Sequence, residues 1–170
     1  MIEIVPIDAA MNADIERLLD HAFGTDRHER TAYKVRGSAT PIASLSFAAI
    51  EERRLVGSIQ CWPVIFTPGD GRTSDLVMVG PVAVEPERQR DGLGRKLMQH
   101  MLARAAETGA DTALMLIGDP EYYGRFFGFD AERTGQWRLP GPVERHRLLA
   151  RGADVPAGEG DLGPRVALPA

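Results

Sequence analysis

Stretches in which apolar and polar residues alternate, or in which apolar residues run together, predict the strands of a sheet. IEIVPI predicts a first strand over residues 2–7. ASLSFAAI and LVGSIQCWPVIF, separated by the charged EERR, predict an antiparallel hairpin, in which Pro63 marks an edge or a bulge. LVMVGPVAV (residues 76–84) and TALMLIG (residues 112–118) are apolar on both faces, as in strands covered on both sides.

Apolar residues at helical spacing predict two longer helices. MNADIERLLDHAF (residues 11–23) and GRKLMQHMLARAAE (residues 94–107) each carry an apolar face, and Gly109 is placed to cap the second. The polar segment GTDRHERTAYKVRG (residues 24–37) predicts a short helix within a long connection. The strand at 76–84, a glycine-rich turn, a helix and another strand follow in the order of a βαβ unit.

Length and composition indicate one ordinary globular domain. The chain has 170 residues, of which 44% are hydrophobic and 26% charged, and this length can bury a substantial core. Residues 151–170 include seven Gly or Pro and little periodicity. We therefore expect a single domain over residues 1–150 and a tail over 151–170 that is extended or partly disordered.

Charge and hydropathy exclude several classes of partner. With 20 basic and 24 acidic residues the net charge is −4, which disfavours nucleic acid. No apolar run approaches the ~20 residues that cross a membrane, and the N-terminus lacks a basic leader segment, so we expect a cytoplasmic protein. The one cysteine, Cys61, lies in an apolar stretch, which predicts a buried, inert thiol. His21, His100 and His146 lack a paired spacing, so no metal site is expected.

The stretch QRDGLG places Gly92 and Gly94 where a helix is about to start. A helix N-terminus exposes about four N–H groups without intrahelical partners and carries a partial positive charge. Glycines there let an anion approach, and Arg90 and Arg95 would add charge, so the stretch fits a phosphate or pyrophosphate site. The alternative is that the two glycines only make a turn and a tight helix-to-sheet contact.

Two common phosphate motifs do not fit this stretch. A dinucleotide fingerprint would need a small residue where Leu97 stands. A P-loop would need Gly-Lys-Ser/Thr, but Lys96 follows Arg95 and precedes Leu97.

The motif instead resembles the acetyl-CoA loop of GNAT-type N-acetyltransferases, whose pattern is Q/R-x-x-G-x-G/A. The strand VGPVAVEPERQ before it, and YYGRFFGF (residues 122–129) after it, are similar to that family's central strand and its tyrosine-bearing helix. In detail the chain is most similar to the YhbS-type predicted acetyltransferases. The resemblance covers roughly residues 2–149.

The resemblance implies an α/β (α+β sandwich) fold. Its mixed, mostly antiparallel sheet has six or seven strands, a central splayed parallel pair and helices on both faces. It also implies acetyl-CoA as cosubstrate and no metal. Backbone groups of the strand would hold the pantetheine arm, amides of the loop would hold the pyrophosphate, and Asp119 would contact the cofactor arm or cap the next helix. These cofactor-binding residues are Val82, Ala83, Val84, Arg90, Asp91, Gly92, Leu93, Gly94, Arg95 and Asp119.

In the same resemblance the leaving thiolate is protonated by a tyrosine early in the helix, which selects Tyr123. Four residues separate Tyr123 from Gly128, one more than in many relatives, and one residue rotates a helix by ~100°. Tyr122 therefore stays a second candidate, and packing of either ring is the alternative. For a general base, Glu85 acting through water and His28 are candidates, against an exposed turn glutamate and an exposed helix histidine.

The function implied is direct acetyl transfer from acetyl-CoA to a primary amine of a small molecule or peptide. The resemblance leaves a homodimer open, and residues 24–40 and 130–150 are expected to shape the acceptor pocket. A non-catalytic acyl-CoA-binding sensor or interaction module of the same fold is the alternative, because the tyrosine spacing is altered. Acylation of a macromolecule such as aminoacyl-tRNA is a weaker one, which the acidic balance disfavours.

Overall fold

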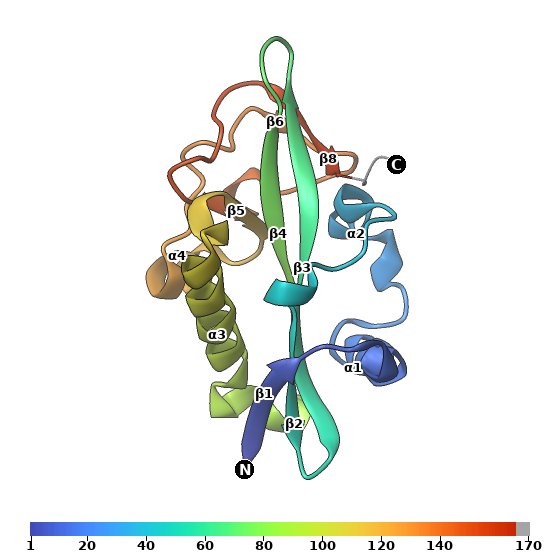
Figure 1. Cartoon of the computed structure of the whole chain (residues 1–170). Helices are drawn as coiled ribbons and strands as arrows, with labels where there is room; N and C mark the ends of the chain where they lie inside the picture. The colour runs from blue at the N-terminus through green and yellow to red at the C-terminus, as the bar shows by residue number, and fades with distance from the viewer. Residues whose placement is uncertain (166–170) are drawn as a thin grey trace. The chain divides into compact units, whose positions relative to one another are not determined.

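A computed structural model describes residues 1–165, with only the backbone described at Arg90 (Figure 1). The chain forms two compact units. Unit 1 contains Met1–His28, Pro41–Cys61 and Val79–Gly109. Unit 2 contains Glu29–Thr40, Trp62–Met78 and the described chain from Ala110 onward. Because β3 (Arg54–Pro68) and β4 (Ser74–Val84) each begin in one unit and end in the other, both units share these two strands.

The sheet of unit 1 is antiparallel at its first three strands. The strand β1 (Ile2–Pro6) pairs with β2 (Phe47–Glu51), which pairs in turn with the first half of β3. The β2–β3 register shifts between Ala49 and Ile50 and ends with Glu51 opposite Arg54. The hairpin predicted from the sequence is therefore confirmed.

Two helices of unit 1 cover opposite faces of its sheet. Neighbouring residues of a strand point to opposite faces. On β2, the Phe47 ring lies 4.5 Å from the ring of His100 on α3 (Leu93–Thr108), whereas Ala48 is buried in a cluster with residues of α1 (Asn12–Phe23). The helix α3 ends at Gly109, whose φ of +74° is the left-handed cap expected there.

Unit 2 holds the parallel strand pair. The strand β5 (Leu114–Ile117) runs parallel to β4, with Val77 opposite Leu114 and Met78 opposite Met115. On its other side β5 pairs antiparallel with β7 (Leu148–Arg151). The second half of β3 pairs with β8 (Gly160–Pro164), which also pairs with the two-residue β6 (Trp137–Arg138).

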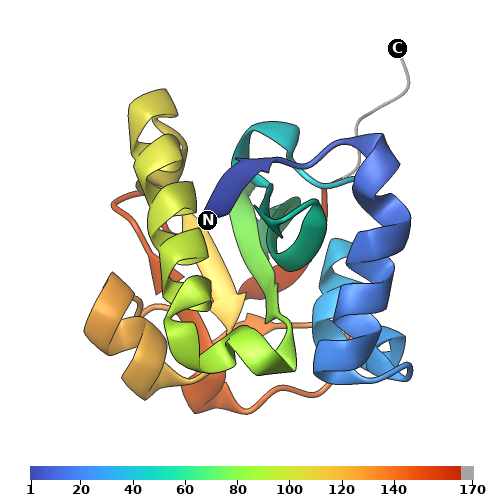
Figure 2. The same cartoon turned by 90° about the horizontal axis from the view of Figure 1, so that it is seen from below.

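The core of unit 2 is aromatic at its centre. Trp137 is completely buried, and its ring lies 5.2 Å from that of Phe66 on β3. Val35 of α2 (Thr31–Arg36) is buried in the same cluster, and α2 is the short helix predicted in the polar connection. Figures 1 and 2 show α2 and α4 (Pro120–Phe127) on opposite sides of the sheet.

The strand order β1-β2-β3-β4-β5-β7, with β8 on β3 and β6 on β8, confirms a mixed, mostly antiparallel sheet with a parallel pair. Within residues 1–165 the sheet has eight strands, where the sequence predicts six or seven. The additional strands β6 and β8 carry no alternating apolar pattern from which they could be predicted. The strand β8 (GDLGP) is held in the sheet by its backbone pairing with β3. It lies in the segment 151–170 predicted as a tail, of which residues 166–170 are outside the described part.

Pro63 and Gly80 mark the irregular points of the two shared strands. Pro63 follows the part of β3 that pairs with β2, which ends at Ile59, and precedes the part that pairs with β8, which begins at Val64. A residue without an N–H thus lies where the partner strand changes. Gly80 has a φ of +122°, which side-chain-bearing residues rarely adopt.

None of the helices described is long and apolar enough to span a bilayer; α3, with 16 residues, is the longest of them.

Candidate active site

The connection from β4 to α3 builds a helix N-terminus without a side-chain cap. A 3-10 helix, η4 (Pro86–Asp91), leads into Gly92, which has φ +72° and ψ 18° and is the N-cap of α3. The first hydrogen bond of α3 runs from the Lys96 N–H to the Gly92 carbonyl oxygen, at 3.1 Å. The N–H groups of Leu93 and Gly94 precede it, in the first turn, where a helix supplies no partner of its own. Such a terminus suits an anion.

Different structural features favour glycine at Gly92 and at Gly94. At Gly92 the left-handed backbone itself favours the residue. At Gly94 a Cβ atom would lie 3.8 Å from Val84 Cγ2 and 3.9 Å from Val82 Cγ1, which is ordinary van der Waals contact. The tight helix-to-sheet approach is instead at Gly57 on β3, where a Cβ would meet Leu93 at 3.2 Å. Turn geometry therefore explains Gly92, whereas neither turn geometry nor packing explains Gly94.

The end of β4 presents backbone groups beside this helix start. The Glu85 N–H donates to the Val56 carbonyl oxygen of β3 at 2.9 Å. Because backbone groups alternate along a strand, those of Val84 and Val82 point to the other edge of β4. Their side chains flank Gly94, so unit 1 brings three of the predicted cofactor residues together. The side chain of Ala83 is buried with α1.

The other predicted loop residues are less buried. The side chains of Asp91 and Arg95 are exposed, and the Asp91 carboxylate lies 3.4 Å from Arg88, a residue the motif did not select. For Arg90 only the backbone, in η4, is described.

In unit 2, the helix α4 begins and ends with standard capping residues. Asp119 is its N-cap and accepts a hydrogen bond from the Glu121 N–H at 3.0 Å, and Pro120 occupies the first turn. Gly128 ends the helix with φ +74°. The contact described for Asp119 is thus the capping one.

Tyr123 lies at the end of β5 against a glycine. A Cβ atom at Gly118, the residue after β5, would be only 2.5 Å from Tyr123 Cε2, so the ring occupies the space of the missing side chain. Burial raises the pKa of Tyr123 to about 12, and Tyr122 and Asp119 act in the same direction, against Arg147. The phenol therefore keeps its proton throughout the neutral range, as a proton donor must.

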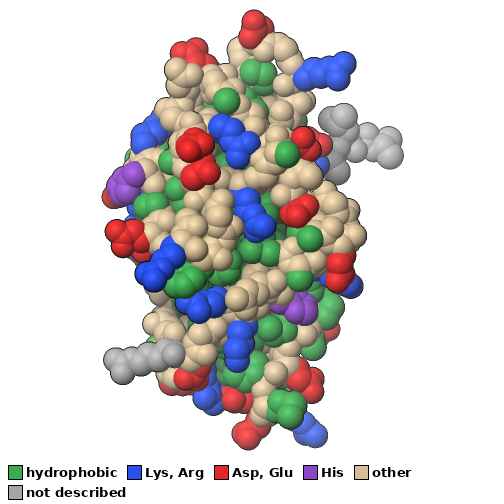
Figure 3. Space-filling model, turned by 90° about the vertical axis from the view of Figure 1, so that its left-hand side faces the viewer, with side chains coloured by type: hydrophobic (Ala, Val, Ile, Leu, Met, Phe, Trp, Pro, Cys, Tyr) green, Lys and Arg blue, Asp and Glu red, His purple; other side chains and the backbone are tan. Residues whose placement is uncertain are grey.

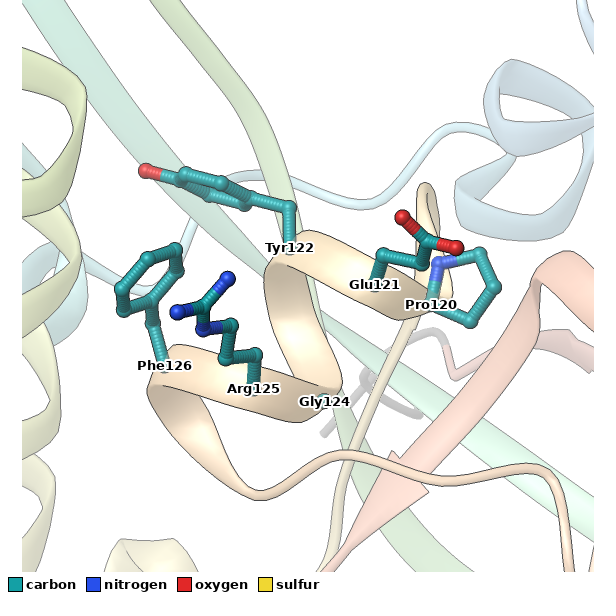
Figure 4. A pocket seen from close by; sticks show the side chains of 6 residues that line it. All are labelled: Pro120, Glu121, Tyr122, Gly124, Arg125 and Phe126. Carbon is teal, nitrogen blue, oxygen red and sulfur yellow. The ribbon is translucent and has the colours of Figure 1, made fainter.

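Tyr122 faces a different environment on the same helix. Its ring meets that of Tyr123 edge-on at 4.9 Å and lines a hollow of about 480 Å³. Figure 4 shows the rings of Tyr122 and Phe126 and the guanidinium of Arg125 gathered on one side of the hollow, with the Glu121 carboxylate apart from them. Adjacent residues on a helix point ~100° apart, so the side chains of Tyr122 and Tyr123 leave the helix in different directions.

Glu85, a general-base candidate whose alternative was an exposed turn glutamate, is buried with 7% of its surface exposed. Its carboxylate lies 3.4 Å from His21 Nδ1 and 3.8 Å from Arg54. These side chains line a cavity of about 220 Å³ together with Asp14 and Arg17 of α1. Since strand residues alternate, Glu85 and Ala83 face α1, whereas Val84 flanks Gly94. The other base candidate, His28, is exposed in η2 (Arg27–Glu29).

No group of three or more potential metal-ligating side chains occurs among the residues described. On the face shown in Figure 3, acidic and basic side chains are interspersed with hydrophobic ones.

Known proteins match the chain in sequence and in fold. Residues 12–129 match the sequence profile of the acetyltransferase (GNAT) family. The chain belongs to the GNAT acetyltransferase family. The resemblance carried by QRDGLG and YYGRFFGF is thereby confirmed. No curated protein matches this GNAT chain at a significant level.

Solved structures extend this likeness over nearly the whole GNAT chain. A GNAT family acetyltransferase from Brucella melitensis, in complex with acetyl-CoA, is 25% identical, with a TM-score of 0.68 over 97% of this chain and 96% of that one. YhbS from Escherichia coli, in complex with CoA, is 23% identical, with a TM-score of 0.72 over 94% and 88%. The ribosomal-protein-S18-alanine N-acetyltransferase from Escherichia coli shares 18% identity and the fold, with a TM-score of 0.54 over 88% and 90%.

Proposed function

We propose that this protein transfers an acetyl group from acetyl-CoA directly to a primary amine of a small molecule or peptide. The observation that carries the proposal is the uncapped start of α3, where Gly94 is glycine although neither its backbone nor its packing requires it. Family membership and the acetyl-CoA and CoA complexes of the similar structures support the same reading.

The first turn of α3 would hold the diphosphate of the cosubstrate. The N–H groups of Leu93 and Gly94 donate to phosphate oxygens, and the positive end of the helix dipole favours the negative charge. The absent side chain at Gly94 lets the phosphate reach these amides. Arg90, Asp91, Gly92 and Arg95 complete the backbone of this loop in our proposal.

The backbone groups of Val82 and the Val84 N–H at this edge would bind the amide-bearing pantetheine arm as an added strand. A backbone N–H at this edge would also donate to the carbonyl oxygen on which negative charge develops. Acetyl-CoA supplies the acetyl group as a thioester when bound.

Tyr123 would donate a hydrogen bond to the sulfur as the carbon–sulfur bond breaks and the carbon–nitrogen bond forms. An alkyl thiol has a pKa near 8.5, about three to four units below that of Tyr123. Outright transfer of the phenolic proton is therefore uphill. We infer that Tyr123 acts as a relay: it gives its proton to the leaving sulfur and takes up the proton that the attacking nitrogen loses. Tyr122 is the second candidate for this role.

The acceptor must attack as a neutral amine. An alkylamine with a pKa of about 10 is roughly 1% neutral at pH 8. The rate at limiting acceptor should therefore rise with pH through the neutral range.

A second candidate function is an acyl-CoA-binding module without turnover. The observation that favours it is the packing of Tyr123 against Gly118, Phe127 and Phe129, which gives the ring a structural role of its own.

The release of CoA thiol from acetyl-CoA, measured against a panel of primary amines, tests the proposal and separates the two functions. Cys61 is completely buried, and burial raises its pKa to about 12, so the folded protein should not consume the thiol reagent. We expect acceptor-dependent release that falls at least about 100-fold in Tyr123→Phe. In Tyr122→Phe, the matched removal of a neighbouring hydroxyl, we expect release within about twofold of wild type.

CoA binding without acceptor-dependent release would establish the binding module instead. Absence of CoA binding by calorimetry would refute both. A large loss in Tyr122→Phe together with an active Tyr123→Phe would reverse the roles of the two tyrosines.

A further inference from the structure

The loop that carries the proposed diphosphate site is fastened to a hairpin by two ion pairs of opposite polarity. Arg88 in η4 pairs with Glu51 at the end of β2, and Glu87 in η4 pairs with Arg54 at the start of β3, at 2.9 Å. We call these four residues the hairpin clasp. All of them belong to unit 1.

The hairpin holds its half of the clasp in a defined geometry. Glu51 and Arg54 are cross-strand partners and enclose the turn residues Glu52 and Arg53. These have φ values of +49° and +67°, as in the tight two-residue turns typical of hairpins. An acidic and a basic side chain therefore stand side by side, facing a basic and an acidic one in η4.

Further contacts join η4 to the end of β4. The Arg88 N–H donates to the Glu85 carbonyl oxygen at 2.8 Å, and its guanidinium lies 3.4 Å from Asp91, the residue before Gly92. The Gln89 side-chain amide reaches the Val84 carbonyl oxygen at 3.4 Å. The described contacts of the Arg88 side chain thus run to carboxylates of the protein.

We propose that Arg88 and Glu51 are positioning residues for the cosubstrate, and that the clasp holds η4 so that Gly92 and the first turn of α3 are ordered before a diphosphate arrives. This inference rests on the proposed binding of acetyl-CoA at this turn. Preordering matters because fixing a loop on binding costs part of the binding free energy. The side chains of Arg88 and Glu51 are 36% and 21% exposed, so we expect a few-fold effect, as for partly exposed ion pairs.

Glu51→Gln is the decisive variant, because long-range electrostatics and loss of the clasp predict opposite changes in the affinity for CoA. Removing a negative charge near a site for an anion strengthens binding through long-range electrostatics. Opening the clasp, in contrast, weakens CoA binding. We expect calorimetry to show that CoA binds Glu51→Gln about threefold to fivefold more weakly than wild type.

The reversed pair provides a rescue. Glu51→Arg alone places two guanidinium groups together, and we expect about tenfold weaker CoA binding although the net charge has become more favourable to an anion. Glu51→Arg combined with Arg88→Glu restores an ion pair, and we expect CoA binding to return to within about twofold of wild type. Such a recovery would show that the loss comes from the broken ion pair and not from the change in charge near the site.

Steady-state kinetics give a second readout. Because the clasp lies outside the chemistry, KM for acetyl-CoA should rise in Glu51→Gln while kcat stays within about twofold of wild type. Arg104→Gln is the matched control, because it breaks an exposed ion pair with Glu107 on α3 that touches neither the hairpin nor η4. We expect it to leave KM unchanged.

Unchanged or tighter CoA binding in Glu51→Gln, or no recovery in the reversed pair, overturns the inference while leaving the proposed function intact. Wild-type protein that binds no CoA overturns the proposed function first, so the two failures are distinguishable.

Discussion

The start of α3 and the helix α4 are the two regions to which we assign the reaction, and they are built in different ways. In our proposal the start of α3 acts through backbone groups: Gly94 has no side chain in the way, and Arg88 of the preceding η4 holds the loop in place. The helix α4 would act through a side chain, that of Tyr123, whose ring packs against the neighbouring Gly118. In the first region Gly94 would leave room for a ligand, and in the second Gly118 leaves room for a ring of the protein itself.

From this contrast we expect the two regions to tolerate substitutions differently. A backbone site is sensitive to what is added near it, since every added atom or charge competes with the ligand. A side-chain site is sensitive to anything that turns the functional group, because a displacement of about 1 Å can remove much of the rate. The four predictions below use this difference, beginning with the largest expected effect.

Gly94→Asp should weaken CoA binding by at least about tenfold, because a carboxylate would stand beside the proposed diphosphate. Its Cβ fits at 3.8 Å from Val84, and an acidic residue in the first turn of a helix is favourable, so the folded state should not lose stability. Calorimetry and thermal unfolding check the two effects. Gly94→Ala is the matched variant, which adds the Cβ without the charge, so we expect a smaller loss of CoA binding than in Gly94→Asp. Wild-type binding in both variants would show that the ligand does not need the missing side chain at Gly94.

Gly118→Ala should displace the Tyr123 ring, since the new Cβ would lie 2.5 Å from Cε2. We expect a loss of about 1–3 kcal/mol in the free energy of unfolding and a lower kcat with an unchanged Kd for CoA. Denaturant unfolding and thiol-release kinetics are the measurements. Gly135→Ala, at an exposed glycine with no atom near its added Cβ, is the control in the same unit. An unaltered kcat in Gly118→Ala would separate Tyr123 from the chemistry.

Gly92→Ala should cost about 1 kcal/mol of stability, because alanine must adopt the left-handed backbone at φ +72°. For a protein of this size the midpoint of thermal unfolding would fall by roughly 2–4 °C. Gly94→Ala, two residues further on, should not lower the midpoint. If both variants unfold at the wild-type temperature, the turn does not depend on Gly92.

The free energy of unfolding at alkaline pH should depend on the burial of Tyr123. Its pKa is raised from 10.0 to about 12, so the folded chain holds the phenolic proton more tightly than the unfolded chain. The resulting stabilisation is fully present below pH 10 and is lost as the pH rises from 10 towards 12. Between pH 9 and pH 11 the free energy of unfolding of wild type should fall by roughly 1 kcal/mol more than that of Tyr123→Phe. Parallel pH curves for the two proteins would mean that the ring is solvated.

Features that depend on local pattern could be predicted from the sequence. The hairpin, the helices α1 and α3 and the parallel pair follow from periodicity, and the start of α3 follows from two glycines placed before an apolar helix. The strands β6 and β8 could not be predicted in this way, because β6 has two residues and β8 is held by backbone pairing and not by an apolar face.

Features that depend on distant pairing were missed for a related reason. Glu51 and Arg88 are 37 positions apart, and each looks like an ordinary surface charge until the fold brings them together. The burial of Glu85 beside His21 has the same cause. The choice between Tyr122 and Tyr123 was left open because one helix position changes the direction of a side chain by ~100°.

The buried position of Cys61 makes its thiol a reporter of local opening in β3. Its N–H and carbonyl oxygen are hydrogen-bonded to Ser46 Oγ and to the Ile42 N–H, and it is the last residue of unit 1 before β3 continues as Trp62. A thiol probe can modify it only when this stretch of β3 separates from its neighbours. The labelling rate under native conditions, divided by the rate for an exposed thiol, therefore gives the equilibrium constant of that separation without any added denaturant.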